Sequence, residues 1–237
     1  MKRKNRGTVS ILKTDGISIT VVRKAVKNMY LRVLPPDGRV QITAPEYTDE
    51  ERILRFVSAK RDWIRRHQRQ IAERPRRPEH RYVTGEKLML WGKEYVLEVR
   101  EAERSDCVLR DEKIILYVKP DTSEEKRRMQ VEKRYRRELE KRIAEILPFC
   151  EERVGVRVRE WRIRRMKTRW GTCNPSRSRI WLNLSLAEKP AECLVYVLIH
   201  ELTHLLEPSH NKRFYALMDR FYPDWKEVRK RLNSWPG

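Results

Sequence analysis

The first 120 residues alternate between apolar and polar positions, which is the pattern of half-buried β-strands. MYLRVLPPDGRVQITAP (29–45) alternates on both sides of a Pro-Asp-Gly turn and predicts a hairpin. LMLWGKEYVLEV (88–99) and CVLRDEKIILYV (107–118) repeat this pattern. Apolar residues over 53–64 recur at helical spacing. We therefore expect a β-rich N-terminal module with one helix over residues 1–120.

The remaining chain mixes helical and strand patterns. Apolar positions over 131–146 mark one face of a long helix. VRVREWRIRR (156–165) and IWLNLSL (180–186) predict strands, and in the second the leucines face one side while Asn183 faces the other. The fold class predicted is therefore α+β, with a second domain over residues 121–237.

A short apolar segment, CLVYVLI (193–199), is apolar all round and predicts a helix buried in the core. It is far too short to cross a bilayer, and no apolar stretch follows the basic start MKRKNRGTVS, so we expect no membrane association and no signal peptide. The cysteines form no C-x-x-C pair and indicate reduced thiols of a cytoplasmic protein. They are Cys107, Cys150, Cys173 and Cys193.

The strong positive charge of the chain indicates a second class of partner. Lys and Arg outnumber Asp and Glu by 55 to 34, and the net charge of +21 is spread along the chain. Such a surface attracts polyanions, so DNA or RNA is a candidate partner, while a surface that only keeps the protein soluble is the alternative. The candidate contacts are Arg76 and Arg77 in a predicted linker, and Arg162, Arg164 and Arg165 on a predicted strand.

The candidate chemistry lies in HELTHLLEPSH (200–210), which holds three of the five histidines. His200 and His204 are one helical turn apart, about 6 Å along the axis, so both imidazoles leave the same face. Pro208 breaks the helix, and His210 can then approach from the other side. Three imidazoles and an open position are the ligand set of a catalytic zinc site, with one Zn²⁺ per chain.

Glu201 points about 100° away from His200 around the helix. It can therefore reach a zinc-bound water without binding the metal, and act as the general base of peptide-bond hydrolysis. Two alternatives stay open. The short motif also occurs by chance on amphipathic helices, and a nucleic-acid-binding protein could hold a structural or vestigial zinc. A purely structural site has no need of an acid at position 201.

The motif H-E-x-x-H-x5-H resembles that of the metzincins, although Glu207 stands where they have a glycine. The chain as a whole resembles the YgjP-like metallopeptidases, which are distant relatives of SprT-like proteases. The matching segments are VRKAVKNMYLRVLPPDGRVQITAP (22–45), TGEKLMLWGKEYVLEV (84–99), RWGTC (169–173), IWLNLSL, Pro190, YVLIHELTHLLEPSHNKRFYALM (196–218) and PDWKEVRKRL (223–232).

This resemblance implies a zincin-like metallopeptidase domain that acts on proteins or peptides. It implies zinc ligands at His200, His204 and His210, and a base at Glu201. Tyr215 stands where the family leads us to expect Trp, a departure that concerns packing more than chemistry.

Two further residues are candidates for substrate binding. Asn183 lies on the strand before the active helix, and zincins often bind substrate along such a strand by β-augmentation. An ordinary edge position is the alternative. Tyr215, shortly after the third histidine, is the second candidate. RWGTC predicts a tight hairpin turn, or a segment placed near the metal. Nothing in the sequence indicates an oligomeric state.

Overall fold

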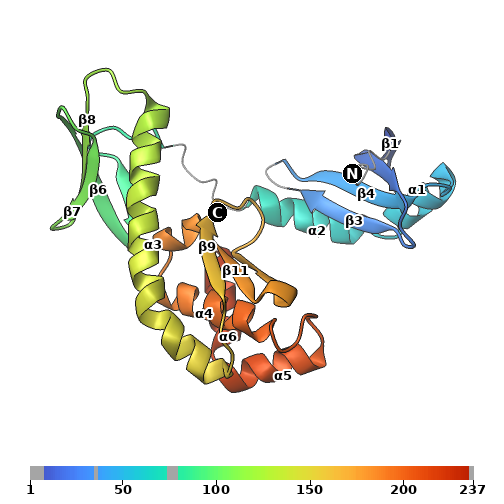
Figure 1. The fold of residues 1–237 in the computed structure, drawn as a ribbon. Coiled ribbons are helices and arrows are strands. Elements are labelled where there is room, and N and C mark those ends of the chain that lie inside the picture. Colours follow the sequence, from blue (N-terminus) through green and yellow to red (C-terminus); the bar gives the residue numbers. More distant parts are fainter. Residues whose placement is uncertain (1–7, 35–36, 74–79, 235–237) are drawn as a thin grey trace, which may run out of the picture. The chain divides into compact units, whose positions relative to one another are not determined.

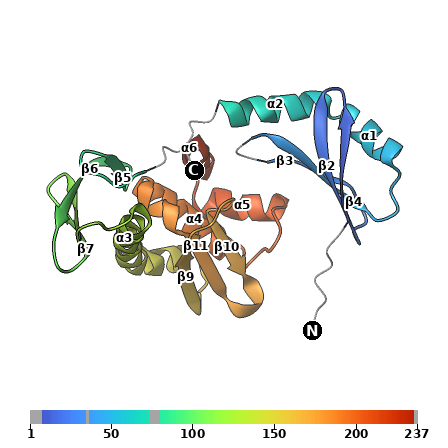
Figure 2. The same cartoon turned by 90° about the horizontal axis from the view of Figure 1, so that it is seen from above.

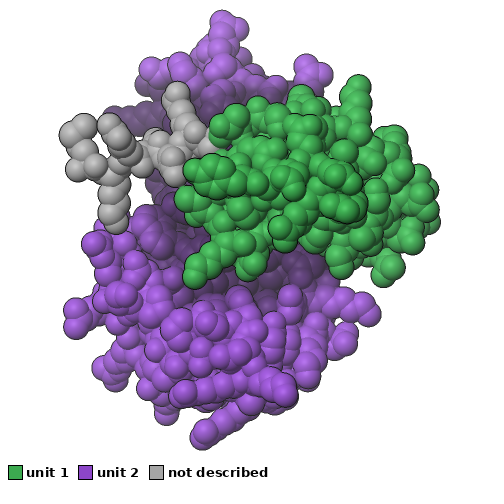
Figure 3. All heavy atoms as spheres, turned by 90° about the vertical axis from the view of Figure 1, so that its right-hand side faces the viewer, with its two compact units in different colours: residues 1–76 green, residues 77–237 purple. Residues whose placement is uncertain are grey.

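The computed structural model describes residues 8–34, 37–73 and 80–234. The chain forms two compact units, residues 1–76 and residues 77–237, which are coloured separately in Figure 3. Each unit has its own cluster of buried apolar side chains. The mixed composition of strands and helices confirms the predicted α+β class.

The first unit holds a four-stranded sheet in the order β1-β2-β4-β3 (Figure 1). β2 and β4 pair in parallel, and each makes an antiparallel hairpin with its outer neighbour, so the hairpin predicted over 29–45 is confirmed. Two helices follow. The elements are β1 (Val9–Thr14), β2 (Ile17–Lys24), β3 (Tyr30–Leu34), β4 (Arg39–Pro45), α1 (Glu50–Ser58) and α2 (Arg61–Ala72).

One helix was expected here, and the described residues of this unit form two. The helical pattern is interrupted after Ser58, where the amide of Lys60 bonds to the carbonyl of Val57 at 2.9 Å and tightens the turn. The core of this unit lies between the alternating inward residues of the sheet, such as Ile19 and Ile42, and the apolar faces of the helices.

The second unit begins with a sheet of the same design. Its order is β5-β6-β8-β7, with β6 and β8 parallel and an antiparallel hairpin on each side. The sheet packs against the first half of a long helix, α3, whose second half packs against α4 (Ala191–Thr203; Figures 1 and 2). The elements are β5 (Lys87–Leu90), β6 (Lys93–Glu101), β7 (Asp106–Arg110), β8 (Lys113–Val118) and α3 (Glu124–Val154).

A three-stranded sheet and three helices complete the unit. β11 lies centrally, antiparallel to β10 and parallel to β9. α4 is buried beneath this sheet and packs against α3, α5 and α6. The elements are β9 (Glu160–Arg164), β10 (Gly171–Asn174), β11 (Arg179–Asn183), α4 (Ala191–Thr203), α5 (Lys212–Phe221) and α6 (Trp225–Ser234). No helix in the described ranges is both long and apolar enough to span a bilayer.

Two expectations differ from the structure. The boundary expected near residue 120 falls inside the second unit, because the sheet β5–β8 shares one apolar core with α3 and α4. The strand expected over 180–186 ends at Asn183 and continues as a 3₁₀ turn, Leu184–Glu188. Every residue of that turn is buried, so the alternation of leucines does not mark two faces there.

Candidate active site

The predicted buried helix is α4. Pro190 stands immediately before its first residue, and most of its side chains from Cys193 to Thr203 are buried. The helix ends at Thr203, five residues before Pro208, so Pro208 does not itself end it. His204 is the first residue after the helix and keeps helical backbone angles, so His200 and His204 still project on one side.

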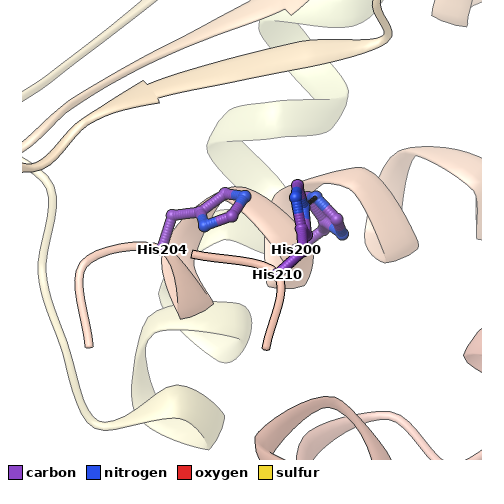
Figure 4. Close-up of side chains that lie close together, drawn as sticks. All are labelled: His200, His204 and His210. Carbon is purple, nitrogen blue, oxygen red and sulfur yellow. Dashed lines mark hydrogen bonds between the residues drawn. The ribbon is translucent and has the colours of Figure 1, made fainter. Parts of the chain in front are cut away.

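The three histidines of the motif converge on one point (Figure 4). Their ligand nitrogens all lie within 4.8 Å of one another, and Nε2 of His210 is 3.0 Å from Nε2 of His200. Within the described part of the chain, these three histidines form the only group of three or more potential ligands that could hold a metal ion. The prediction that His200, His204 and His210 form one cluster agrees with this geometry.

The connection from His204 to His210 is shaped by Glu207. Its carbonyl lies 3.1 Å from Nδ1 of His204, and its carboxylate accepts a hydrogen bond from the amide of Ser209. The Nδ1–H of His204 therefore donates to this carbonyl, which leaves Nε2 free for a metal. The backbone of Glu207 lies outside the positive-φ region, so a glycine is not needed at this turn.

A phenylalanine supports all three imidazoles from behind. Phe214 is fully buried, and its ring centroid lies 5.0 Å from His200, 4.6 Å from His204 and 4.7 Å from His210. Asn211 caps the helix that carries it, because its side chain accepts a hydrogen bond from the amide of Phe214 at 3.0 Å. The ligands are thus backed by a rigid apolar surface.

Electrostatics keep the imidazoles neutral. Burial lowers the pKa of His200 to about 3, and the neighbouring His204 and His210 act in the same direction. Burial also lowers the pKa of His204 and of His210. Neutral imidazole is the form that binds a metal ion, so the cluster is ready for one at pH 7.

Glu201 is buried beside the cluster, with 4% of its surface exposed. Burial raises its pKa to about 8, while the positive charge of Arg169 acts in the opposite direction. Among the described residues, its Oε2 has no hydrogen-bond partner. A buried carboxylate oxygen without a partner is costly unless a ligand completes the site.

These observations fit a divalent metal. Three neutral nitrogens supply the donors, and the carboxylate of Glu201, the residue after His200, has an oxygen that can still accept a hydrogen bond. A bound cation would also favour the ionised form of Glu201, which burial alone disfavours.

The two candidates for substrate binding occupy different surroundings. Asn183 is 4% exposed, and its side-chain amide bonds to the backbone of Met166, Arg169 and Ser185. These bonds hold the loop before β10, so the side chain is used inside the protein. Tyr215 is half-buried, and its ring stacks on Trp225 at 5.5 Å and lies 6.4 Å from His210.

The candidate arginines for nucleic-acid binding also differ in their contacts. Arg162 and Arg164 lie over the ring of Trp181, with guanidinium carbons 5.6 and 5.1 Å from its centroid. Arg165 makes an ion pair with Glu132 at 2.7 Å. Arg76 and Arg77 lie outside the described residues.

Sequence reasoning missed the residues that hold the site in shape. In the sequence, Phe214 is an ordinary apolar residue of a predicted helix, and Gly171 is predicted to be a turn glycine. The signal that was available for Phe214 is Asn211 three residues before it, which is an N-cap pattern. Gly171 carries no such local signal, because its neighbour Glu201 is distant in the sequence.

A model of the YgjP-like metallopeptidase domain matches residues 27–235. No curated protein matches the chain significantly. Among solved structures, the metallopeptidase zymogen of Pyrococcus abyssi abylysin is similar, with 24% sequence identity and a TM-score of 0.36, over 38% of this chain and 90% of that chain. A TM-score this low does not establish a shared fold.

Proposed function

The chain belongs to the YgjP-like metallopeptidase family, and we propose that it hydrolyses peptide bonds with one zinc ion held by His200, His204 and His210. The observation that carries this proposal is Glu201, a buried acid with an uncompleted oxygen beside three neutral imidazoles. Its substrates are proteins or peptides, as the family implies.

When bound, the zinc ion would act as a Lewis acid that polarises the scissile carbonyl and activates water. The three imidazoles would hold the ion. Phe214 packs against all three rings, and the carbonyl of Glu207 orients the ring of His204. Glu201 takes the proton of the attacking water and delivers it to the leaving amine. Its buried position keeps bulk water from competing for that proton.

The alternative is a nucleic-acid-binding protein with a structural or vestigial zinc. A structural site of that kind is closed by four protein ligands. Here three histidines converge, and the residue after the first of them, Glu201, is a buried acid whose Oε2 has no partner within the described ranges. This arrangement favours hydrolysis over a purely structural role.

The test compares the new peptide ends that wild type and Glu201→Gln generate in a whole-cell protein extract, with and without added DNA. We expect cleavage by wild type that Glu201→Gln does not reproduce. Identical sets of peptide ends from the two proteins would contradict the proposal. Cleavage by wild type only when DNA is present would identify nucleic acid as a cofactor of the reaction.

We also propose that the protein binds DNA or RNA without sequence preference. Three guanidinium groups surround the half-buried ring of Trp181 on the outer side of β9 and β11, and those of Arg162 and Arg164 belong to exposed residues. Guanidinium groups contact phosphate, and an aromatic ring can stack on a base. The net charge of +21 adds attraction of longer range.

This second proposal is tested by salt titration of binding to labelled single- and double-stranded DNA and to RNA. Affinity is expected to fall steeply with salt, because each neutralised phosphate releases counterions. Arg164→Gln should weaken binding, whereas Arg142→Gln on α3, which is paired with Glu145, is the matched control. No binding at low salt, or binding that is indifferent to salt, would contradict it.

We also propose a cytoplasmic location for the protein. Its four cysteines, all within the described ranges, are free, and such thiols are typical of a reducing compartment. Fractionation of cells that express the full chain tests this placement, and recovery mainly outside the cytoplasm would contradict it.

A further inference from the structure

The segment RWGTC (169–173) has entered the chemistry described so far only through the charge of Arg169, which acts on Glu201. It leads into β10, which is an edge strand of the sheet above α4. Gly171, the first residue of β10, pairs with Leu182 on β11. The strand therefore passes over the helix at the level of the active site.

Gly171 lies directly against the side chain of Glu201. A Cβ atom at position 171 would lie 2.5 Å from Oε1 of Glu201, 2.8 Å from its Cγ and 2.9 Å from its Cδ. Separations below 3.0 Å are essentially never found for a real Cβ atom. No side chain fits at position 171 unless Glu201 moves.

The need for glycine here is steric and not conformational. Gly155 and Gly92 have positive φ angles of 78° and 76°, whereas Gly171 lies outside the positive-φ region. Alanine could therefore adopt the backbone of Gly171 without strain. The three heavy atoms nearest to this position, in the part of the chain that the structure describes, all belong to the side chain of Glu201.

The chain is anchored just before this contact. The buried amide of Asn183 bonds to the carbonyls of Met166 and Arg169 at 2.9 and 2.8 Å, just before the strand. The carbonyl of Trp170 accepts a hydrogen bond from the amide of Asn183 at 2.8 Å, and its indole donates to Asn233 at 3.3 Å. The backbone at Gly171 therefore cannot easily withdraw from Glu201.

We propose that Gly171 is a positioning residue, which holds the carboxylate of Glu201 in place by leaving no space on the strand side. The contact replaces hydrogen bonds in this task, because Oε2 of Glu201 has none within the described part of the chain. This inference rests on the proposed function for the role of Glu201, but the contact itself can be tested without activity.

The first test is a double-mutant cycle in the melting temperature of the zinc-loaded full chain. Gly171→Ala alone should lower the melting temperature by several degrees, because overpacking of a fixed site is destabilising. In Glu201→Ala the colliding atoms are gone, and Gly171→Ala should then be neutral or slightly stabilising, since alanine loses less backbone entropy than glycine. Thr172→Ala, on the opposite face of β10, is the control and should behave alike in both backgrounds.

If Gly171→Ala lowers the melting temperature equally in both backgrounds, or in neither, the proposed contact between Gly171 and Glu201 is wrong. If Gly171→Ala alone is too unstable to purify, recovery of folded protein in the double variant supports the contact, and failure of both overturns it.

The second test measures zinc content and kinetics of Gly171→Ala. Zinc content and KM should stay near wild type, while kcat falls at least tenfold because the base is displaced. An unchanged kcat would overturn the positioning role. If wild type itself cleaves nothing, the proposed function fails, and the melting cycle still decides the contact.

Discussion

His204 shows how a single residue is prepared for its task. Its Nδ1–H is used by the carbonyl of Glu207 at 3.1 Å, and its ring stacks on Phe214 at 4.6 Å. Only Nε2 remains to bind a metal, and the ring cannot rotate without breaking both contacts. In the proposed zinc site, His204 would therefore be oriented before the ion arrives, which favours tight binding.

Replacement of this ligand should remove the metal. We expect His204→Ala to bind zinc more than about 100-fold more weakly, because loss of supporting contacts alone typically costs 10–100-fold. Metal analysis after dialysis against a zinc buffer measures this. Cys173→Ser is the control, and it should keep its zinc. Full zinc occupancy in His204→Ala would remove that residue from the site.

The cysteines give a prediction that depends on pH. Burial raises the pKa of Cys107 and Cys173 to about 12, and of Cys150 and Cys193 to about 11. The thiolate is the reactive form, so at pH 8 all four thiols should react slowly with a disulfide reagent in the native protein. Unfolding in guanidinium should expose four reactive thiols. Rapid reaction of all four without denaturant would contradict the burial described.

Residues whose role depends on local spacing could be predicted from the sequence, and the others could not. The interval between His200 and His204 fixes their common face, so the ligand cluster followed from the helix pattern. The contact between Gly171 and Glu201 joins positions thirty residues apart, and no local pattern reports it. Asn183 was placed on an outward face by alternation, but its amide is buried.

At the scale of elements, β11 explains that difference. The alternation of IWLNLSL predicts one strand, but pairing with β10 ends at Leu182 and pairing with β9 ends at Asn183. The chain then turns in a buried 3₁₀ segment, because Asn183 accepts a hydrogen bond from the amide of Ser185 at 3.1 Å. Apolar alternation could not distinguish a strand from a buried turn, since both place leucines inside.

The start of α5 offers a test at this scale. Asn211→Ala should lower the free energy of unfolding by about 1 kcal/mol, because the helix loses its N-cap. For a domain of this size that is roughly 2–4 °C in melting temperature. Lys212→Ala, at the exposed first residue of α5, is the control. An unchanged melting temperature in Asn211→Ala would show that the cap does not stabilise the helix that carries Phe214.

The whole molecule contains two sheets of one design, with the same strand order and the same pairing directions. The residues of both sheets alternate between apolar and polar, and this shared pattern led to the prediction of one module over residues 1–120. Their cores differ, because the second sheet packs with α3 while the first packs with α1 and α2. The strands could be predicted from the sequence. The division of the apolar residues into two cores could not, because it depends on which helix covers which sheet.

This division predicts that residues 77–237 fold without the first unit. The fragment should unfold in one cooperative transition and bind about one zinc ion, because its apolar core and all three ligands lie within it. Circular dichroism during heating and metal analysis measure the two properties. A fragment that lacks a cooperative transition would show that the first unit is needed for folding.

The most direct measurement of the central claim is the activity of purified Glu201→Gln at known zinc content. The side chain is not a ligand, so zinc should remain at about one ion per chain, as in wild type. Loss of the base should lower kcat by about 10²–10⁴-fold. Cleavage by Glu201→Gln at the wild-type rate, with zinc bound, would contradict the assignment of Glu201 as the base.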